Sequence, residues 1–581
     1  MINRTLPAVF LETAKKFKHK KAVSYKKDGL YYSLSYGKLA DKIRIFAANM
    51  AHLGLKKGDR LAILSRNCPE WVVFDLGTML FGGITVPIHP TLSPKIIAYV
   101  LNHSEAKIMI VNSLELLNKV LLVSDDLKHL KKIIYMGRGK IRLEERFKLN
   151  IEFWSEIMKA DFSKKAIAEE VLPEVDSTDI CSIIYTSGTT GLPKGVCLTH
   201  DNFLSDVEAV LKAVPVDDTD VFLSFLPLSH VLERTAGYYI PLSVGASVIY
   251  AESVKRLPKN LKEIKPTILI SVPRVLEKFH DGIYDKMKSG AKWKKALFYY
   301  ALKQPKDAWT AKILDRLVFQ KVRKALGGHL RLIVSGGASL NPTIGKFFNK
   351  IGLTVLEGYG LTETSPVVAA NRIGRIKFGT VGLPMDGIEI EIAEDREILV
   401  KGPIVMSGYY EDSAATAEAI DDDGWFHTGD LGFLDHEGYL TIIGRKKEMM
   451  VTSGGKNIWP EPIEQKINID KYITQSMVVA HNRKFVSALI IPDWPELKKY
   501  LAEQGMAWGD QEEILANPKV VALFESRVKQ INAELPDYEQ IKAFHLLVNE
   551  FSEAKDEMTP TLKLRRQTIE SHYKKEIESM Y

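Results

Sequence analysis

The chain has 581 residues, of which 46% are hydrophobic and 26% charged, and its net charge is +7. This length predicts two to four domains with large packed cores. The charge is mild and lies on no recognisable nucleic-acid module, which argues against DNA or RNA partners but is compatible with anionic ligands or lipid head groups.

The N-terminal region and the cysteines indicate a cellular compartment. The first 22 residues have no apolar segment typical of a signal peptide. Cys68, Cys181 and Cys197 are widely spaced, which argues against a disulfide framework or zinc site and fits a reducing compartment. Val72–Ile88 is weakly charged but contains Asp75, and it predicts a core helix followed by a strand rather than a membrane span. The sequence favours the cytoplasm and leaves peripheral membrane contact open.

Apolar runs of strand length alternate with helical patterns over the first 400 residues. This alternation predicts an α/β fold with largely parallel sheets, in which ligands bind at the loops after the strand carboxyl ends. The runs are Arg60–Leu64, Ile108–Val111, Ile180–Tyr185, Val221–Phe225, Ala246–Tyr250, Thr267–Ser271 and Leu330–Ser335.

The pattern changes near residue 385 to short β-like segments. Gly387–Ile392 and Glu397–Val400 flank a predicted turn at Glu394 and Asp395, and Tyr439–Ile443 is a further predicted strand. Ser476–Ala480 and Val486–Ile491 flank a polar turn and predict a hairpin. The tail from Glu512 to Tyr581 is charged and largely helical in pattern. These features predict an α+β region at the carboxyl end.

A loop rich in glycine and hydroxyl groups follows the apolar run Ile180–Ile184. Its sequence from Tyr185 to Gly195 is YTSGTTGLPKG. Glycines let backbone N–H groups approach a phosphate, hydroxyls donate hydrogen bonds and Lys194 supplies charge, so this loop predicts nucleotide phosphate binding. The spacing differs from a Walker A motif, which excludes a P-loop ATPase. The alternative is an ordinary surface loop of turn residues.

This loop resembles the phosphate-loop signature of the AMP-forming adenylating superfamily, which includes acyl-CoA synthetases, luciferases and peptide-synthetase adenylation domains. Three further segments resemble other signatures of that family, in the same order along the chain. They are Tyr359–Thr364 (YGLTET), Gly424–Asp430 (GWFHTGD) and Gly444–Glu448 (GRKKE). Within the family, the chain is most similar to long-chain fatty acid–CoA ligases.

The resemblance implies a large N-terminal domain, residues 1–444, with mostly parallel sheets flanked by helices and a small β-subdomain. It also implies a small mobile C-terminal domain, residues 445–581, hinged at Lys447. The alternative for the cluster from Arg445 to Lys447 is a solvated basic face.

The resemblance further implies which residues bind ATP and Mg²⁺. Thr362 would contact the α-phosphate, Asp430 the ribose hydroxyls, and Arg445 the ribose or a phosphate. Thr186 and Glu363 would lie at the metal, which prefers oxygen ligands. The remaining implied contacts are Thr186, Ser187, Gly188, Thr189, Thr190 and Lys194 for the β- and γ-phosphates, and Gly336, Gly337, Gly358, Tyr359 and Gly360 for adenine.

The catalytic lysine implied by the resemblance is Lys563, in the segment Thr559–Arg566. That segment resembles the corresponding loop of long-chain acyl-CoA synthetases but departs from the commoner family pattern, because Leu562 replaces a glycine. Three neighbouring cations, Lys555, Arg565 and Arg566, therefore compete for the assignment. Lys563 would bridge the acyl carboxylate and the α-phosphate.

The substrate prediction depends on two runs that resemble long-chain fatty acyl-CoA synthetases, Pro227–Tyr239 and Val272–Lys278. His230, Tyr238 and Tyr239 are candidates to line an acyl channel, and the alternative for the tyrosines is ordinary core packing. A basic and aromatic stretch between Lys288 and Arg331 is either an interfacial segment that draws fatty acid from a bilayer or a solvated helical face.

The predicted activity is a two-step ligation with ATP, Mg²⁺ and CoA. A fatty acid would attack the α-phosphate to give acyl-AMP and pyrophosphate, and the CoA thiol would then displace AMP. The alternatives are an acyl–acyl-carrier-protein synthetase and a non-catalytic binding protein on the same fold. Chain length stays open, because an apolar channel discriminates weakly per methylene. The thiol acceptor and a homodimer also stay open.

Overall fold

The structure is a computed structural model of the whole chain. The residues that it describes are 4–137, 149–159, 172–186, 192–288, 290–305, 310–552, 555–558 and 564–581.

The chain divides into two compact units. The first comprises residues 1–391, 399–428 and 434–441, and the second comprises residues 392–398, 429–433 and 442–581. The predicted boundary between residues 444 and 445 stays a prediction. Among the described residues, no helix has the length and apolar character needed to cross a membrane.

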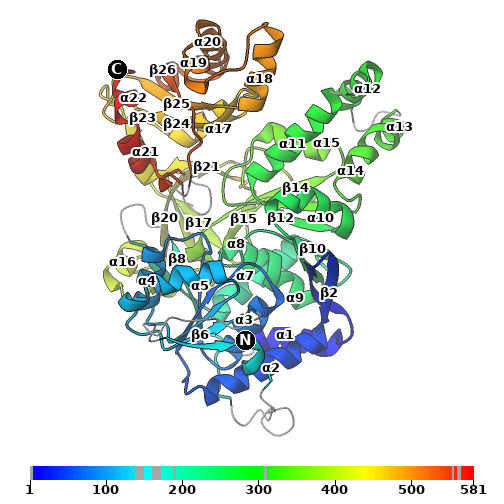
Figure 1. Cartoon of the computed structure of the whole chain (residues 1–581), viewed down its shortest axis with the longest axis vertical. Helices are drawn as coiled ribbons and strands as arrows, with labels where there is room; N and C mark the ends of the chain where they lie inside the picture. The colour runs from blue at the N-terminus through cyan, green and yellow to red at the C-terminus, as the bar shows by residue number, and fades with distance from the viewer. Residues whose placement is uncertain are drawn as a thin grey trace. The chain divides into compact units, whose positions relative to one another are not determined.

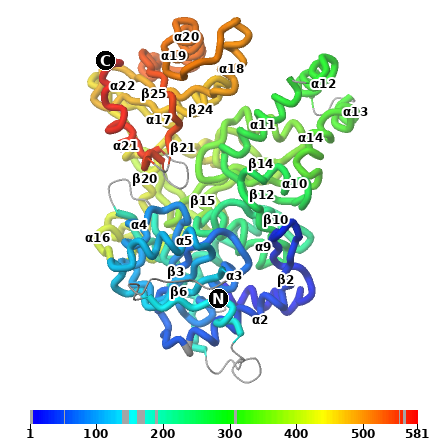
Figure 2. Tube along the Cα trace, in the orientation of Figure 1, coloured from blue at the N-terminus to red at the C-terminus, as the bar shows by residue number. Residues whose placement is uncertain are grey.

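A nine-stranded sheet forms half of unit 1, in the order β16-β15-β14-β13-β12-β10-β11-β1-β2. Its central strands are parallel, whereas β2, β15 and β16 join antiparallel at the edges. Figure 2 shows the blue β2 beside the green β10 region, where β1 pairs with β11. The strands are β1 (Lys21–Lys27), β2 (Leu30–Ser35), β10 (Val221–Ser224), β11 (Ser247–Tyr250), β12 (Ile268–Ser271), β13 (Leu332–Ser335), β14 (Thr354–Gly360), β15 (Val367–Ala370) and β16 (Leu383–Pro384).

An eight-stranded sheet forms the other half, in the order β19-β9-β8-β4-β3-β5-β6-β7. The pairs from β8 to β7 are parallel, and β9 and β19 join antiparallel. The strands are β3 (Arg60–Leu64), β4 (Ile84–Ile88), β5 (Ile108–Val111), β6 (Lys132–Tyr135), β7 (Asn150–Phe153), β8 (Ile180–Thr186), β9 (Lys194–Thr199) and β19 (Gly408–Tyr409).

The α/β prediction is confirmed, and all seven predicted strands are present. Arg60–Leu64 and Ile108–Val111 match at both ends, and the others differ by one or two residues. Val72–Ile88 forms the end of helix α3 (Pro69–Leu80) and strand β4, as predicted. Cys181 is fully buried in β8, as its place in an apolar run predicts.

Helices cover both sheets of unit 1. Figure 1 shows α4 and α5 beside the eight-stranded sheet and α10, α11 and α15 around β12 and β14. The helices are α1 (Leu6–Lys16), α2 (Tyr36–His52), α3, α4 (Pro94–His103), α5 (Leu114–Leu121), α6 (Trp154–Ile157), α7 (His200–Ala213), α8 (Val231–Arg234), α9 (Ile240–Val244), α10 (Leu257–Ile264), α11 (Pro273–Lys288), α12 (Lys292–Lys303), α13 (Ala311–Leu314), α14 (Gln320–Ala325), α15 (Pro342–Lys350) and α16 (Ser413–Ala419).

Short strands also form a four-stranded sheet, β17-β18-β20-β21. Its members β17 (Glu389–Ile392), β18 (Glu397–Lys401) and β21 (Leu440–Arg445) match the three predicted segments, and Glu394 and Asp395 form the predicted turn. The fourth member, β20 (Phe426–Leu434), begins in the GWFHTGD segment, which was not predicted as a strand.

Unit 2 is built on the predicted hairpin of β24 (Ile473–Val479) and β25 (Val486–Pro492), which are antiparallel. The prediction of a helical tail is wrong in part, because β26 (Ile541–Leu546) joins β25 as a parallel third strand. The other elements include β22 (Met450–Val451), β23 (Asn457–Ile458), α17 (Pro460–Asn468), α18 (Trp494–Glu503), α19 (Gln511–Ala516), α20 (Pro518–Asn532), α21 (Arg566–His572) and α22 (Lys574–Glu578).

Candidate active site

Strands β8 and β9 form the base of the predicted phosphate loop. Thr186 at the end of β8 pairs with Lys194 at the start of β9, so both ends of the predicted loop Tyr185–Gly195 belong to strands. The Tyr185 hydroxyl lies 2.8 Å from His103 Nδ1, a contact that ties the base to α4. Ser187, Gly188, Thr189 and Thr190 lie outside the described residues.

Tyr409 connects two predicted site residues of unit 1. The Lys194 Nζ lies 5.0 Å from the centroid of the Tyr409 ring, within cation–π distance. The Tyr409 hydroxyl donates a hydrogen bond of 3.1 Å to Glu363 Oε1. Tyr409 reaches this position because β19 pairs with β9, with Tyr409 opposite Val196. Tyr409 is not among the residues predicted from the sequence.

The environment of Tyr409 keeps its hydroxyl protonated. Burial raises the pKa of Tyr409 far above its usual range, and the neighbouring Glu363 carboxylate raises it further. A protonated hydroxyl can only donate toward a carboxylate, so the bond has a fixed direction. Tyr409 therefore orients one oxygen of Glu363.

Glu363 lies on a short 3₁₀ turn, η6 (Thr362–Thr364), which follows β14. The Glu363 carbonyl accepts a 2.9 Å hydrogen bond from the Met406 backbone N–H. The Thr364 hydroxyl is buried and accepts a 3.0 Å bond from the Leu361 N–H, which closes the turn. Thr362 begins the turn and is only half-buried.

The donor chemistry around Glu363 fits magnesium bound together with a nucleotide. Among the described residues, no cluster of three or more histidine, cysteine, aspartate or glutamate side chains could hold a metal on its own. Mg²⁺ at a nucleotide needs only one or two protein carboxylates, since phosphates and waters complete its shell. The Glu363 carboxylate and the Thr186 hydroxyl supply oxygen donors of the required kind.

The two predicted adenine segments lie at the carboxyl ends of two neighbouring strands of the nine-stranded sheet. β13 and β14 are parallel neighbours, with Ser335 opposite Glu357, so Gly336 and Gly337 follow β13 where β14 reaches Gly358 and Tyr359. Gly337 has φ +81°, a conformation that favours glycine.

A close backbone approach explains Gly360. A Cβ at Gly360 would lie 1.6 Å from the Pro366 carbonyl oxygen, a distance that no side chain tolerates. This close contact therefore requires glycine at position 360 whether or not a ligand binds.

The predicted acyl contacts lie in one helical run from α8 to α9. His230 caps α8, with its Nδ1 accepting a 3.3 Å bond from the Leu232 N–H. Tyr238 and Tyr239 lie on a π-helical turn, η3 (Thr235–Tyr239), and both are buried. The Tyr239 hydroxyl donates to Asp75 Oδ2 at 2.8 Å, and Asp75 also forms a fully buried ion pair with Arg234.

Both tyrosines line a small apolar pocket between α1, α3, α7 and α9. Its volume is about 20 Å³, room for about one water molecule. Core packing accounts for the present positions of Tyr238 and Tyr239, and their contact with an acyl chain stays a prediction.

In unit 2, the two residues assigned to the ribose lie side by side. Asp430 is buried in β20, and Arg445 ends β21. The Arg445 Nε lies 3.0 Å from Asp430 Oδ1, so the guanidinium holds the carboxylate in place. This ion pair was not part of the prediction.

The basic cluster after Arg445 separates into two kinds of side chain. Lys446 forms ion pairs with Asp395 Oδ2 at 2.6 Å and Glu397 Oε2 at 3.0 Å. Lys447, the predicted hinge, is exposed in the next 3₁₀ turn. Lys447 therefore fits the predicted solvated basic face better than the ion-paired Lys446 does.

Lys563 lies outside the described residues, but the structure describes its three competitors. Arg565 pairs with Asp556 at 2.8 Å. Arg566 forms a bidentate pair with buried Glu464 at 2.6 and 2.7 Å, which makes it part of the core of unit 2. Both arginines therefore have structural partners of their own, whereas Lys555 is exposed.

Two family models match this chain. The AMP-binding enzyme model matches residues 10–410, and the AMP-binding enzyme C-terminal domain model matches residues 447–581. The chain belongs to the AMP-binding enzyme family. The first match contains the phosphate-loop strands, Glu363 and Tyr409 of this AMP-binding enzyme, and the second contains Lys447 and Lys563.

Curated relatives are similar over nearly their whole length. The long-chain-fatty-acid–CoA ligase FadD15 of Mycobacterium bovis is 35% identical, in an alignment that covers 95% of this chain and 93% of that protein. The peroxisomal long chain acyl-CoA synthetase 6 of Arabidopsis thaliana is 31% identical, with 95% of this chain and 82% of that protein covered.

Solved structures share the fold of this AMP-binding enzyme. The anthranilate CoA ligase AuaEII, solved in complex with anthranoyl-AMP, has a TM-score of 0.78 and 19% sequence identity. The match covers 100% of this chain and 99% of that chain. At this identity, the likeness concerns the fold alone.

Proposed function

We propose that this AMP-binding enzyme is a long-chain fatty acid–CoA ligase that consumes ATP. The observation that carries the assignment is the 35% identity to a long-chain-fatty-acid–CoA ligase over 95% of the chain. In the first step, a carboxylate oxygen attacks the α-phosphorus of ATP, and the bond to pyrophosphate breaks. In the second step, the CoA thiol gives up its proton and attacks the acyl carbon, and AMP leaves.

The first step brings two anions together, so the enzyme must position them and neutralise their charge. In unit 1, Lys194 supplies a positive charge beside Thr186, and both would bind the phosphates of ATP together with Ser187, Gly188, Thr189 and Thr190. Thr362 would contact the α-phosphate. Gly336, Gly337, Gly358, Tyr359 and Gly360 would accept the adenine ring.

Glu363 and Thr186 would hold magnesium with the nucleotide. The bound ion supplies charge neutralisation on the phosphate oxygens. The Tyr409 hydroxyl donates a hydrogen bond to Glu363 Oε1, which holds the carboxylate in one orientation. Tyr409 thereby acts as a positioning residue.

In unit 2, Asp430 would accept hydrogen bonds from both ribose hydroxyls, and Arg445 holds its carboxylate in place. Lys563 would bridge the acyl carboxylate and the α-phosphate. Residues 445–581 would form the mobile domain that moves about Lys447 between the two steps. His230, Tyr238 and Tyr239 would contact the acyl group.

The assay that tests this function measures AMP release from ATP with acids of increasing chain length. We expect release that depends on a long-chain acid and on CoA. The acyl–acyl-carrier-protein alternative predicts release with holo carrier protein and none with CoA. A non-catalytic binding protein predicts no AMP with either acceptor.

We also propose a homodimer and peripheral contact with a membrane. The molar mass in solution tests the first, with a value near twice the 65.4 kDa of one chain expected. A value of one chain mass would contradict it.

A further inference from the structure

One segment of unit 1 carries more positive charge than the whole chain. Residues 286–324 contain twelve lysines and arginines and two aspartates, a net charge of +10, whereas the chain as a whole carries +7. All other residues together therefore carry −3. The described parts of this segment form the end of α11, then α12, α13, a π turn (Asp315–Phe319) and α14.

These helices have one face in the core and one face in solvent. Phe298 and Ala301 of α12 are buried in the same core cluster as Leu314, Val318 and Val322. Figure 1 shows α11 running outward from the β12 and β14 region, with α12 and α13 at its far end. The outer face is therefore a surface of this unit and not a disordered tail.

Large apolar side chains lie on the outer face. Trp293 is 64% exposed and Tyr300 is 51% exposed, and their spacing of seven residues puts them on one side of α12. On the next helical run, Ile313 is 53% exposed and Leu317 is 49% exposed, four residues apart on one side. We call these four exposed side chains, two on each helical run, the apolar stripe.

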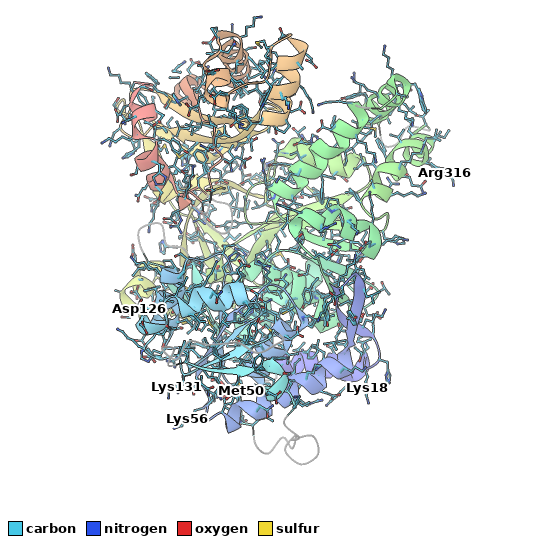
Figure 3. The ribbon with its side chains drawn as sticks, viewed as in Figure 1. Lys18, Met50, Lys56, Asp126, Lys131 and Arg316 are labelled. Atoms are coloured by element: carbon cyan, nitrogen blue, oxygen red, sulfur yellow. The ribbon has the colours of Figure 1, made fainter. Side chains whose placement is uncertain are left out.

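Exposed cations surround this stripe. Lys292, Lys294 and Lys295 flank Trp293, and Lys312 and Arg316 flank Ile313, all of them exposed. Figure 3 labels Arg316 on the outer side of its helix. Aromatic and aliphatic side chains among lysines are typical of helices that lie in the interface of an anionic bilayer.

We propose that the outer faces of α12, α13 and the π turn Asp315–Phe319 dock on an anionic lipid bilayer. The cations bind the acidic head groups, and Trp293, Tyr300, Ile313 and Leu317 enter the boundary between head groups and acyl chains. A polyanion such as RNA would satisfy the cations but not the aliphatic side chains, which favours lipid. That the bilayer supplies the fatty acid substrate rests on the proposed function.

Co-sedimentation with vesicles tests the docking. We expect the full chain to bind phosphatidylcholine vesicles that contain phosphatidylglycerol, to bind pure phosphatidylcholine far less, and to lose binding as salt screens the charges. The combined change Lys292→Glu, Lys294→Glu and Lys295→Glu should lower the partition coefficient by about tenfold or more. The combined change Trp293→Ser and Tyr300→Ser should lower it by about tenfold.

A matched control changes the same number of charges elsewhere in unit 1. Lys56, Lys128 and Lys131 are exposed and have no ion pair among the described contacts, and Figure 3 places Lys56 and Lys131 at the opposite end of this unit from Arg316. Changing all three to glutamate should leave vesicle binding unchanged. Thermal melting of each variant checks that it folds.

Three results would overturn the docking surface: no binding of the unchanged chain to anionic vesicles, an equal loss in the control variant, or full binding by the Trp293→Ser and Tyr300→Ser variant. The last result would indicate a site for polyanions in general.

AMP release with albumin-bound fatty acid separates this proposal from the proposed function. All variants should retain that activity, and its absence in the unchanged chain would refute the ligase assignment while vesicle binding stood.

Discussion

At the scale of single residues, Tyr409 connects residues of two separate sequence signatures. It contacts Lys194 through its ring and Glu363 through its hydroxyl. The sequence signatures identify the charged residues because lysine and glutamate at fixed places in a motif have an evident chemistry. They do not identify Tyr409, because its position depends on the pairing of β19 with a strand about 200 residues earlier.

The change Tyr409→Phe should weaken binding of magnesium–ATP by about threefold to tenfold, the range expected for one lost hydrogen bond to a carboxylate. The ring remains, so ATP without magnesium should bind as before. Calorimetric titration of ATP with and without Mg²⁺ measures both. Tyr410→Phe is the matched control, and equal binding of magnesium–ATP by the Tyr409 variant would contradict the positioning role.

At the scale of elements, the run from α8 to α9 contains an unusual buried carboxylate. Neither oxygen of Glu233 accepts a well-aligned hydrogen bond, and the residue is 1% exposed. Burial raises the pKa of Glu233 to about 8, and Ser224 offsets the rise only in part. Glu233 contacts the π-helical turn at Gly237, where an added Cβ would lie 2.5 Å from Oε1.

The raised pKa makes stability fall as pH rises. The folded protein keeps the Glu233 proton up to about pH 8, whereas the unfolded chain releases it near the ordinary value of 4.5. The free energy of unfolding should thus decrease between these values, and Glu233→Gln should remove a loss on the order of 5 kcal/mol. Denaturant unfolding at several pH values measures this, and parallel pH profiles for both proteins would contradict it.

The elements themselves were largely predictable from sequence. Buried parallel strands read as continuous apolar runs, so all seven predicted strands were found. β26 was missed because Ile541–Leu546 alternates polar and apolar residues within a charged helical region and becomes a strand by pairing with β25. The ion pairs Arg445–Asp430 and Arg566–Glu464 were not predictable, since each joins segments that only the fold brings together.

At the scale of the whole molecule, the proposed function divides the chemistry between two units. Unit 1 contains the residues assigned to phosphates, metal and adenine, and unit 2 contains those assigned to the ribose and to carboxylate activation. Of the four cations near the carboxyl end, Arg565 and Arg566 have ion-pair partners, which favours Lys563 or Lys555 as the catalytic lysine. We assign the adenylation step to Lys563.

The most direct test compares the two half-reactions of Lys563→Ala. We expect acyl-AMP formation from ATP and a long-chain acid to fall by about a hundredfold or more, because the cation between two anions is lost. Transfer of the acyl group from supplied acyl-AMP to CoA should continue near the unchanged rate. Lys555→Ala is the matched control and should retain both half-reactions. Normal acyl-AMP formation by Lys563→Ala would contradict the account.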